Sequence, residues 1–229
     1  NALFNLNFVA KPGLTTAIIG ATGAGKSTIV NLIPRFYDVS QGKILIDGIN
    51  IKDLSQSDLR NQIGYVPQKI TLFSGTIESN LRYADDNVSE KTIREASEAA
   101  QVLEFINTRE QAFNAPISQS GTNISGGQKQ RLSIARALVK YFPVLIFDDS
   151  FSALDFKTDA ALRKALKKQT GESTIIIIAQ RISTIMSAEQ IIVLDEGRIV
   201  GKGTHNELLN SCQEYKEIAL SQLDMEELV

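Results

Sequence analysis

The chain has a single cysteine, Cys212, among its 229 residues. An internal disulfide is therefore excluded, and such sparse use of cysteine fits a reducing compartment. We interpret Cys212 as an inert, packed thiol, because free cysteines are among the most buried residues in folded proteins.

Long hydrophobic runs are also missing. The longest strongly apolar stretch, residues 175–179, is far shorter than the roughly 20 residues that a membrane-spanning helix needs. No secretory signal pattern is visible. The chain begins with Asn1 in place of Met, within a segment that already alternates between apolar and polar residues, so we expect it to be part of a longer polypeptide.

Neither sign of charge is in large excess. The chain has 24 Lys and Arg against 26 Asp and Glu, a net charge of −2. This balance predicts neither a nucleic-acid partner nor a basic membrane-binding surface. A hydrophobic content of 43% is ordinary for a globular protein. The length suits one large domain, or one domain with a sizeable insertion.

Apolar runs and helical patterns alternate along the chain, which predicts an α/β core. Several runs are apolar without alternation, as is typical of parallel strands covered on both faces. The predicted strands are 3–9, 16–19, 43–46, 63–66, 144–147, 174–178 and 191–194. The predicted helices are 26–33, 89–107, 125–140 and 159–169.

The middle of the chain has a different pattern. From about 76 to 140 no convincing strand is visible, and apolar residues recur at helical spacing. We therefore predict one domain, 1–229, with a core of 1–75 and 141–229 and an inserted helical subdomain at about 76–140. Residues 204–229 predict two short helices. The acidic residues at their end, Asp224, Glu226 and Glu227, are interpreted as a solvated face.

Residues 20–28, GATGAGKST, fit the P-loop template G-x-x-x-x-G-K-[ST] between a predicted strand and a predicted helix. In that context backbone N–H groups bind phosphates, Lys26 adds a positive charge, and Ser27 offers a hydroxyl to Mg²⁺. The alternative is a glycine-rich turn that matches by chance. The candidate nucleotide-binding residues are Gly20, Thr22, Gly23, Ala24, Gly25, Lys26, Ser27 and Thr28.

Two further motifs can handle phosphate. VLIFDD at 144–149 places Asp148 at the end of an apolar strand, where open α/β sheets bind ligands, and a phosphate-bound Mg²⁺ explains an acid there. ISGGQ at 124–128 places the helix-capping Ser125 and two glycines at a helix start that can hold an anion. The alternatives are a solvated loop for the first motif and a flexible Ser/Gly joint for the second.

The order P-loop, ISGGQKQR, VLIFDD and SALD (152–155) resembles the nucleotide-binding domain of an ATP-binding cassette (ABC) transporter over essentially the whole chain. Gln68, in YVPQ, resembles the Q-loop of that family, and LFSGTIESNLRY at 72–83 resembles its exporter branch. The resemblance implies an α/β P-loop NTPase (RecA-like) core with an antiparallel β edge and an inserted α-helical subdomain.

In that family two such domains dimerise head-to-tail around two ATP molecules, and hydrolysis drives transport by an attached transmembrane domain. The resemblance therefore implies ATP and Mg²⁺ as cofactors, a second ABC domain and a transmembrane domain as partners, and a location at the cytoplasmic face of the cell membrane. Lys26, Ser27, Asp148 and Gln68 would serve one ATP and its Mg²⁺. Ser125, Gly126, Gly127 and Gln128 would cap the partner's ATP, and Asp155 would lie at the dimer seam.

Two positions depart from the family pattern. Asp149 replaces the Glu that polarises the attacking water, and Gln180 replaces the switch histidine. Asp is one methylene shorter than Glu, and a misplacement of about 1 Å can cost about 100-fold in rate. Gln can donate a hydrogen bond but cannot carry a proton as His can. The only histidine, His205, is expected to be a surface residue that does not replace the switch.

These departures suggest the degenerate half of a heterodimeric ABC exporter, with Asp149 and Gln180 at a slowly hydrolysing site. Gln119, where many homodimeric exporters carry Glu, favours the same reading. The adenine-stacking aromatic of the family would lie before residue 1, so we expect this chain alone to bind ATP weakly.

Four alternatives stand beside this hypothesis. Both changes can be tolerated drift in a working site, or the domain can bind ATP for regulation without turnover. An SMC-type ATPase of chromosome maintenance is disfavoured because no sustained heptads separate the motifs. A GTPase is disfavoured because no Asn-Lys-x-Asp motif is present.

Overall fold

The structure, a computed structural model, describes residues 3–222. The acidic residues Asp224, Glu226 and Glu227 lie outside the described residues. The chain forms two compact units. The first comprises Asn1–Gly64, Phe142–Asp149 and Glu172–Val229, and the second comprises Tyr65–Tyr141 and Ser150–Gly171.

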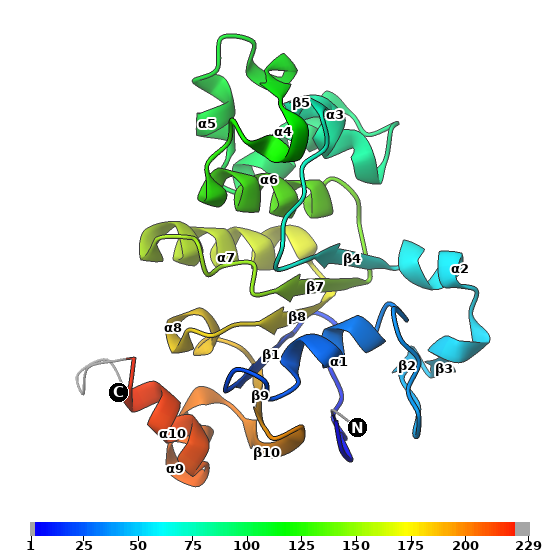
Figure 1. The fold of residues 1–229 in the computed structure, drawn as a ribbon, viewed down its shortest axis with the longest axis vertical. Coiled ribbons are helices and arrows are strands. Elements are labelled where there is room, and N and C mark those ends of the chain that lie inside the picture. Colours follow the sequence, from blue (N-terminus) through cyan, green and yellow to red (C-terminus); the bar gives the residue numbers. More distant parts are fainter. Residues whose placement is uncertain (1–2, 223–229) are drawn as a thin grey trace. The chain divides into compact units, whose positions relative to one another are not determined.

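A six-stranded sheet with the order β10-β9-β1-β8-β7-β4 organises the first unit (Figure 1). β1 pairs in parallel with β8 and β9, and β7 pairs in parallel with β8, whereas β10 runs antiparallel to β9. The predicted α/β core with an antiparallel edge is thus confirmed. The strands are β1 (Thr15–Gly20), β4 (Ile63–Val66), β7 (Val144–Asp148), β8 (Thr174–Ile178), β9 (Gln190–Asp195) and β10 (Arg198–Gly203).

The central strands are hydrophobic because they are buried on both faces, as the sequence predicted. All of β7 is buried, and four of the five residues of β8 are buried as well. Strands covered on both faces need no polar alternation. Five of the seven predicted strands therefore match a strand of this sheet to within one residue at either end, and the predictions 63–66 and 174–178 match β4 and β8 without any shift.

The predicted strand at 3–9 is wrong. Residues 3–10 form no strand, and Asn5 has a left-handed backbone with φ 52°. That conformation interrupts an extended segment, and Asn is one of the few residues that adopt it readily. The segment is held instead by a backbone hydrogen bond from Phe4 N to Gly197 O at 2.8 Å.

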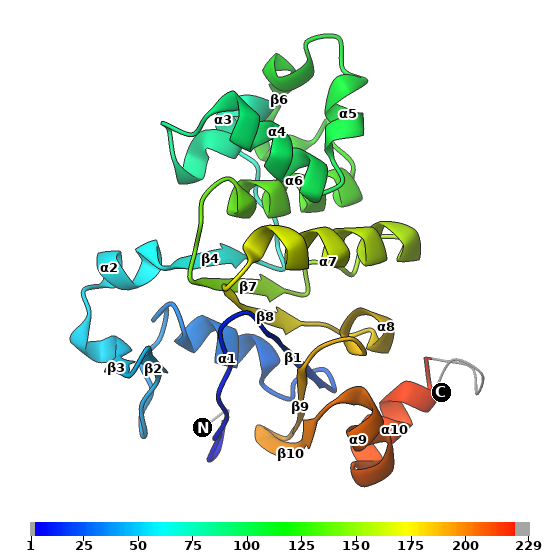
Figure 2. The same ribbon diagram turned by 180° about the vertical axis from the view of Figure 1, so that it is seen from behind.

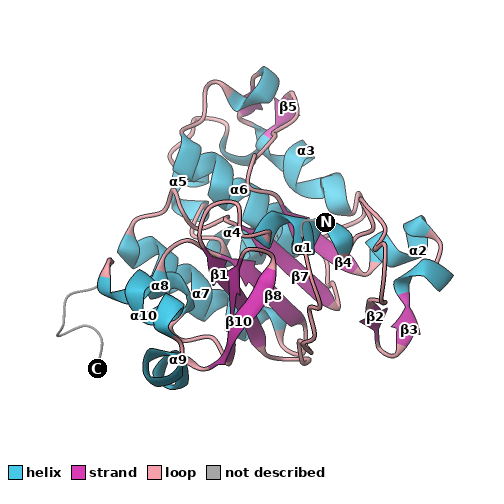
Figure 3. Ribbon diagram, turned by 60° about the horizontal axis from the view of Figure 1, so that its bottom comes forward, coloured by secondary structure: helices cyan, strands magenta, loops and turns pink. Residues whose placement is uncertain are grey.

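A hairpin of two short strands completes the strands of the first unit. The predicted strand 43–46 shortens to β2 (Leu45–Ile46), which pairs with β3 (Ile49–Asn50) in a two-stranded sheet of its own (Figure 3). Asp47 and Gly48 join them with φ values of 49° and 82°. Two positive φ values are the requirement of a type I′ turn, for which Asp-Gly is a strong sequence signal.

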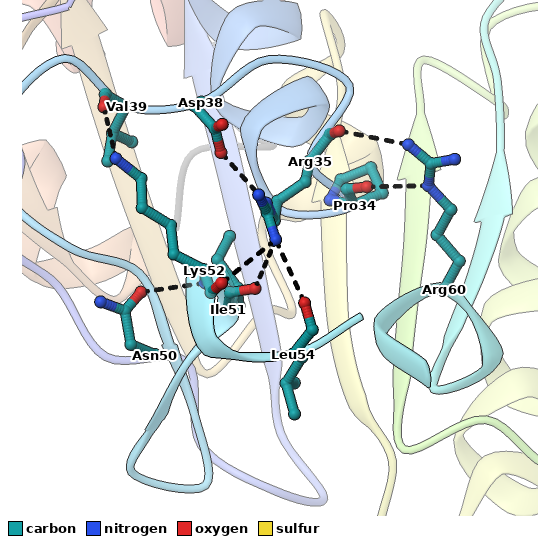
Figure 4. A network of polar contacts seen from close by, with 9 residues as sticks. All are labelled: Pro34, Arg35, Asp38, Val39, Asn50, Ile51, Lys52, Leu54 and Arg60. Atoms are coloured by element: carbon teal, nitrogen blue, oxygen red, sulfur yellow. Dashed lines mark hydrogen bonds and ion pairs between the residues drawn. The ribbon is translucent and has the colours of Figure 1, made fainter. Parts of the chain in front are cut away.

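Two arginines fix the chain that follows helix α1 (Lys26–Leu32) in the first unit (Figure 4). Arg35 pairs with Asp38 through Nε at 3.0 Å and donates from Nη1 to the carbonyls of Ile51 and Leu54 at 3.1 and 3.2 Å. Arg60 donates to Pro34 O at 3.1 Å. These bonds join the end of α1 to η1 (Ile51–Asp53) and α2 (Gln56–Asn61).

The C-terminal part of the first unit contains three short helices. α8 (Ile182–Ile185) lies between β8 and β9 in the chain, and α9 (His205–Ser211) and α10 (Gln213–Leu220) follow β10. The last two contact each other and confirm the predicted pair of helices (Figure 1). Tyr215, at 0% exposure, anchors α10.

The second unit is mostly helical and contains the segment predicted as a helical subdomain (Figure 2). α4 contacts both α6 and α7. One small exception to the expected absence of strands is the pair β5 (Gly75–Thr76) and β6 (Pro116–Ile117). The helices are α3 (Ile77–Leu81), η2 (Arg82–Ala84), α4 (Glu90–Ala99), α5 (Leu103–Asn107), η3 (Ala112–Asn114), η4 (Gln119–Gly121), α6 (Gly126–Leu138) and α7 (Phe156–Thr170).

The single helix predicted at 89–107 is two helices in the structure. α4 ends where Gln101 adopts φ 56°. Val102 N then bonds to Ser97 O at 2.9 Å and Gln101 N to Glu98 O at 2.9 Å, the hydrogen-bond pattern of a Schellman motif. A Schellman motif usually has Gly at this position, but here the residue is Gln101. The sequence therefore contains no glycine that would predict the end of the helix.

None of the helices within residues 3–222 is both long enough and apolar enough to cross a membrane.

Candidate functional site

The P-loop leaves the carboxyl end of β1 at Gly20 and reaches the start of α1 at Gly25. Gly20 passes so close to β9 that a Cβ there would lie 2.1 Å from the carbonyl oxygen of Leu194. Gly25 caps α1 in the left-handed region with φ 101°. A side chain at Gly20 would thus displace backbone, and Gly25 has a conformation that other residues adopt at a cost.

Lys26 extends back along the loop that precedes it. Its Nζ donates to the carbonyl oxygens of Gly20 and Ala21 at 2.7 and 2.8 Å. Burial of the ammonium lowers the pKa of Lys26, and the nearby carboxylates of Asp149 and Asp148 act against that shift. The charge is therefore held beside the loop whose N–H groups can bind phosphate.

Ser27 and Asp148 place two oxygen atoms side by side. Ser27 Oγ donates to Asp148 Oδ1 at 3.5 Å, and Asp148 is 5% exposed at the end of β7. Hard oxygen donors of this kind suit Mg²⁺, which usually takes one or two protein oxygens and completes its shell with phosphate and water. Within residues 3–222, no group of three or more His, Cys, Asp or Glu could hold a metal ion.

Asp149 and Gln180 are joined by a hydrogen bond, from Gln180 Nε2 to Asp149 Oδ2 at 2.8 Å. The two residues follow the neighbouring parallel strands β7 and β8, whose register pairs Asp148 with Ile178. Asp149 is buried, has φ 49°, and donates its N–H to Ile178 O at 3.0 Å. Both departures from the family pattern thus meet in one contact.

In the second unit, Ser125 and Gln128 form a capping box at the start of α6. Gln128 N donates to Ser125 Oγ at 3.4 Å, and Ser125 N donates to Gln128 Oε1 at 3.1 Å. The first turn of α6 contains no acidic residue, and Gly126 is exposed with no atom within 4 Å of a Cβ built there. The prediction that Ser125 caps this helix is confirmed.

Asp155 and Gln68 also belong to the second unit. Asp155 caps α7, and it accepts from Thr158 Oγ1 at 2.7 Å and from Thr158 N at 2.9 Å. These bonds lower the pKa of the fully exposed Asp155 carboxyl. Gln68 is exposed and follows the end of β4 by two residues.

The predicted residues thus separate between the two units. Those of the P-loop, with Asp148, Asp149 and Gln180, lie in the first unit, whereas Gln68, Ser125–Gln128 and Asp155 lie in the second. A family model described as "ABC transporter" matches residues 3–152, more than half of the chain. The chain belongs to the ABC transporter family.

The relatives of this ABC domain are transporter components. The ABC transporter ATP-binding protein YfiB of Bacillus subtilis (strain 168) is 48% identical over 225 residues, which cover 98% of this chain and 39% of the relative. The ATP-dependent lipid A-core flippase of Haemophilus influenzae (strain ATCC 51907 / DSM 11121 / KW20 / Rd) is 45% identical over 218 residues, covering 95% of this chain and 37% of the flippase.

A solved structure agrees with these relatives. The structure of a bacterial Atm1-family ABC exporter with ATP bound matches this chain with a TM-score of 0.94 and 40% sequence identity, covering 97% of this chain and 39% of that one. The chain is therefore an ATP-binding domain of ABC type and an ATPase, homologous to the corresponding domains of ABC exporters. It spans 39% or less of the length of the relatives named here.

Sequence reasoning missed one residue that supports the P-loop of this ABC domain. Gly197 N donates to Ala24 O at 3.1 Å. Gly197 lies with Glu196 in the turn between β9 and β10, and their φ values are 75° and 43°. The Glu196-Gly197 pair between the apolar run of β9 and the alternating segment of β10 was the available signal for this hairpin, and β10 was not predicted.

His205 corrects one prediction about this ABC domain. It is buried, at 7% exposure, and its Nδ1 lies 2.7 Å from Tyr215 Oη. Burial lowers the pKa of His205. The expected surface position is thus wrong, because the ring packs between α9 and α10. Cys212 is buried as expected, and burial raises the pKa of its thiol.

Proposed function

We propose that this chain is one of two ATP-binding domains of an ABC exporter, and that ATP-dependent, head-to-tail dimerisation with the second domain drives transport. The observation that best supports ATP binding is the arrangement of the P-loop, in which Lys26 lies beside the loop and Ser27 contacts Asp148. The 1–229 chain would act as one ABC ATPase domain, with a helical subdomain at about 76–140.

In its own site, backbone N–H groups of 20–28 would bind the phosphates and Lys26 would neutralise part of their charge. Ser27, Asp148 and Gln68 would hold a Mg²⁺, which would supply positive charge beside the phosphates. Carboxylate, hydroxyl and amide oxygens are the ligand types that Mg²⁺ takes.

In the partner's site, Ser125, Gly126, Gly127 and Gln128 would cap the ATP held by the other domain, and Asp155 would lie at the seam. The start of α6 suits this role, because its first N–H groups favour an anion and Gly126 leaves them uncovered. The partner would be a non-identical chain that supplies the residues missing here.

The two sites would be unequal. Asp149 has the shorter acidic side chain, and one of its oxygens accepts a hydrogen bond from Gln180. That oxygen is less available to a water molecule, and the amide of Gln180 cannot accept a proton from it. This chain's own site would therefore bind ATP and hydrolyse it slowly, while the partner's site carries most of the turnover.

The deciding experiment pairs the complete transporter chain with its partner and compares two base-removing variants. Asp149→Ala is expected to change ATPase turnover by less than about threefold, whereas removal of the partner's own base is expected to abolish it. A collapse of turnover in Asp149→Ala equal to that of the partner variant would contradict the asymmetric assignment and would favour tolerated drift in a working site.

The remaining length of the relatives leaves room for a transmembrane domain in the same polypeptide. ATP domains of ABC transporters work on the cytoplasmic side, so we place this chain at the cytoplasmic face of the cell membrane. Expression of the complete gene followed by membrane fractionation tests this placement, and recovery of the complete protein only in the soluble fraction would contradict it.

A further inference from the structure

The loop that leads from Ser150 to Asp155 is fastened at two points by buried side chains of the second unit. Ser150 Oγ donates to Val66 O at 3.0 Å. Ala153 N donates to Gln130 Oε1, on α6, at 3.2 Å. Ser150 is 0% exposed and Gln130 is 3% exposed. The bond from Ser150 is buried, whereas the bond from Ala153 N, a residue of the exposed part of the loop, is partly buried.

Three of the four bonded residues lie two positions along the chain from a residue to which the proposed function gives a role. Val66 precedes Gln68, Gln130 follows Gln128, and Ala153 precedes Asp155 by that spacing. A Cβ built on Gly127 would lie 3.4 Å from Ala153 O, so the start of α6 also approaches this loop closely. One buried and one partly buried bond thus join all three segments within one compact unit.

A buried glutamine in the middle of a helix needs such a reason, because Gln is mostly exposed in folded proteins. Hydrophobic packing alone is not directional and would allow the loop to shift along α6. A hydrogen bond to one backbone N–H fixes a distance and an orientation between the loop and the buried side chain of Gln130.

We propose that Gln130 and Ser150 are positioning residues that hold Gln68 in a fixed arrangement with Ser125–Gln128 and Asp155, the residues that complete the partner's ATP site. This inference rests on the proposed function, which gives each of those three segments a role in ATP binding. It assigns to Gln130 and Ser150 an effect on turnover that exceeds their effect on folding.

The test uses the complete transporter with its partner and measures kcat for ATP, ATP binding without turnover, and thermal unfolding. Gln130→Met removes the acceptor at similar volume, and Gln130→Glu retains an oxygen that can accept from Ala153 N. We expect Gln130→Met to lower kcat about tenfold or more, because small misplacements have large effects on rate, and Gln130→Glu to recover most of that loss.

Ser133→Ala is the matched control. Ser133 is also a buried polar residue of α6, and its hydroxyl accepts a hydrogen bond at 3.4 Å from Arg136 on the same helix. It should lower stability without lowering kcat. If Gln130→Met does not fold, Ser150→Ala tests the positioning role in its place. This variant removes only the hydroxyl that bonds to Val66 O, and we expect it to lower kcat in the same way.

A loss of thermal stability with an unchanged kcat in Gln130→Met would overturn this inference. If Gln130→Met does not fold, the same result in Ser150→Ala would overturn it. Gly126→Asp, measured in the same complex, separates that failure from a failure of the proposed function. If Gly126→Asp abolishes turnover and the positioning variants do not, only the positioning role is wrong. If Gly126→Asp also leaves turnover unchanged, the role assigned to α6 in the partner's site is wrong.

Discussion

At the scale of single residues, Lys26 is the residue on which nucleotide binding should depend most. Burial of its ammonium lowers the pKa of Lys26. The ammonium donates hydrogen bonds to two backbone carbonyls of the loop. A phosphate would replace these neutral acceptors with a charged one, and charge-assisted hydrogen bonds are about twice as strong as neutral ones.

We therefore predict that Lys26→Ala weakens ATP binding by about tenfold to 100-fold, the equivalent of one lost hydrogen bond between charged groups. Titration with a fluorescent ATP analogue in the presence of Mg²⁺ measures the change. Lys129→Ala, which removes a lysine from α6, is the control and should leave the affinity of this site unchanged. Equal affinity for Lys26→Ala and the parent chain would contradict ATP binding at the P-loop.

His205 predicts how stability depends on pH. Its folded pKa lies below its unfolded value of about 6.5, so the unfolded state binds the proton more readily. Stability is therefore full above that value and is lost as pH falls through it towards the folded pKa. The slope for one proton cannot exceed about 1.4 kcal/mol per pH unit.

Thermal unfolding between pH 7.5 and about 5.5 checks this prediction, because no other side-chain type has an ordinary pKa in that interval. His205 is the only histidine in the chain. His205→Gln, which can still bond to the hydroxyl of Tyr215, should reduce the pH dependence relative to the parent chain. The same pH dependence in both proteins would show that His205 is not its source.

At the scale of elements, the sequence predicted the strands whose apolar residues are buried. It did not predict the breaks that depend on the backbone conformation of a single residue. β7 and β8 were predicted because continuous burial makes them continuously apolar. The break after α4 and the irregular segment at 3–9 were missed because they depend on Gln101 and Asn5. Each has a left-handed backbone without being glycine, and hydrophobic periodicity contains no information about φ.

The start of α6 carries a prediction at the same scale. Gly126→Asp adds an acidic residue to a first turn that has none, which favours the helix by about 0.3–1 kcal/mol through its dipole. The open space around Gly126 accepts the side chain. The same negative charge would face the phosphates of the partner's ATP, so we expect turnover of the complete transporter to fall by at least about tenfold.

Gly126→Asn has nearly the same shape without the charge and separates repulsion from bulk. It should retain more ATPase activity than Gly126→Asp, and both variants should unfold at or near the temperature of the parent protein. Equal losses of ATPase activity in the two variants would show that the size of the side chain at position 126, and not its charge, lowers turnover.

At the scale of the whole molecule, topology explains how much of the site could be read from the sequence. The P-loop, Asp149 and Gln180 all follow parallel strands of one sheet, and the carboxyl ends of such strands meet at one edge. Residues that directly follow such strands are therefore expected to lie at one edge of the sheet. The Gln180–Asp149 hydrogen bond could not be predicted, because a side-chain contact depends on rotamers that no motif encodes.

That hydrogen bond gives the asymmetric exporter its sharpest test. Because the two side chains touch, replacing one alone leaves the other without its partner, and their effects should not add. We predict that Asp149→Glu with Gln180→His raises hydrolysis at this site about tenfold or more, and that the two single variants together give less.

The measurement needs a complete transporter whose partner has lost its own base, so that only this site contributes to ATPase activity. Glu adopts the left-handed backbone of residue 149 less readily than Asp does, so thermal unfolding must be followed in parallel. The double variant should gain activity despite a small loss of stability. Activity equal to that of the parent, in a folded double variant, would show that these two residues are not what limits hydrolysis here.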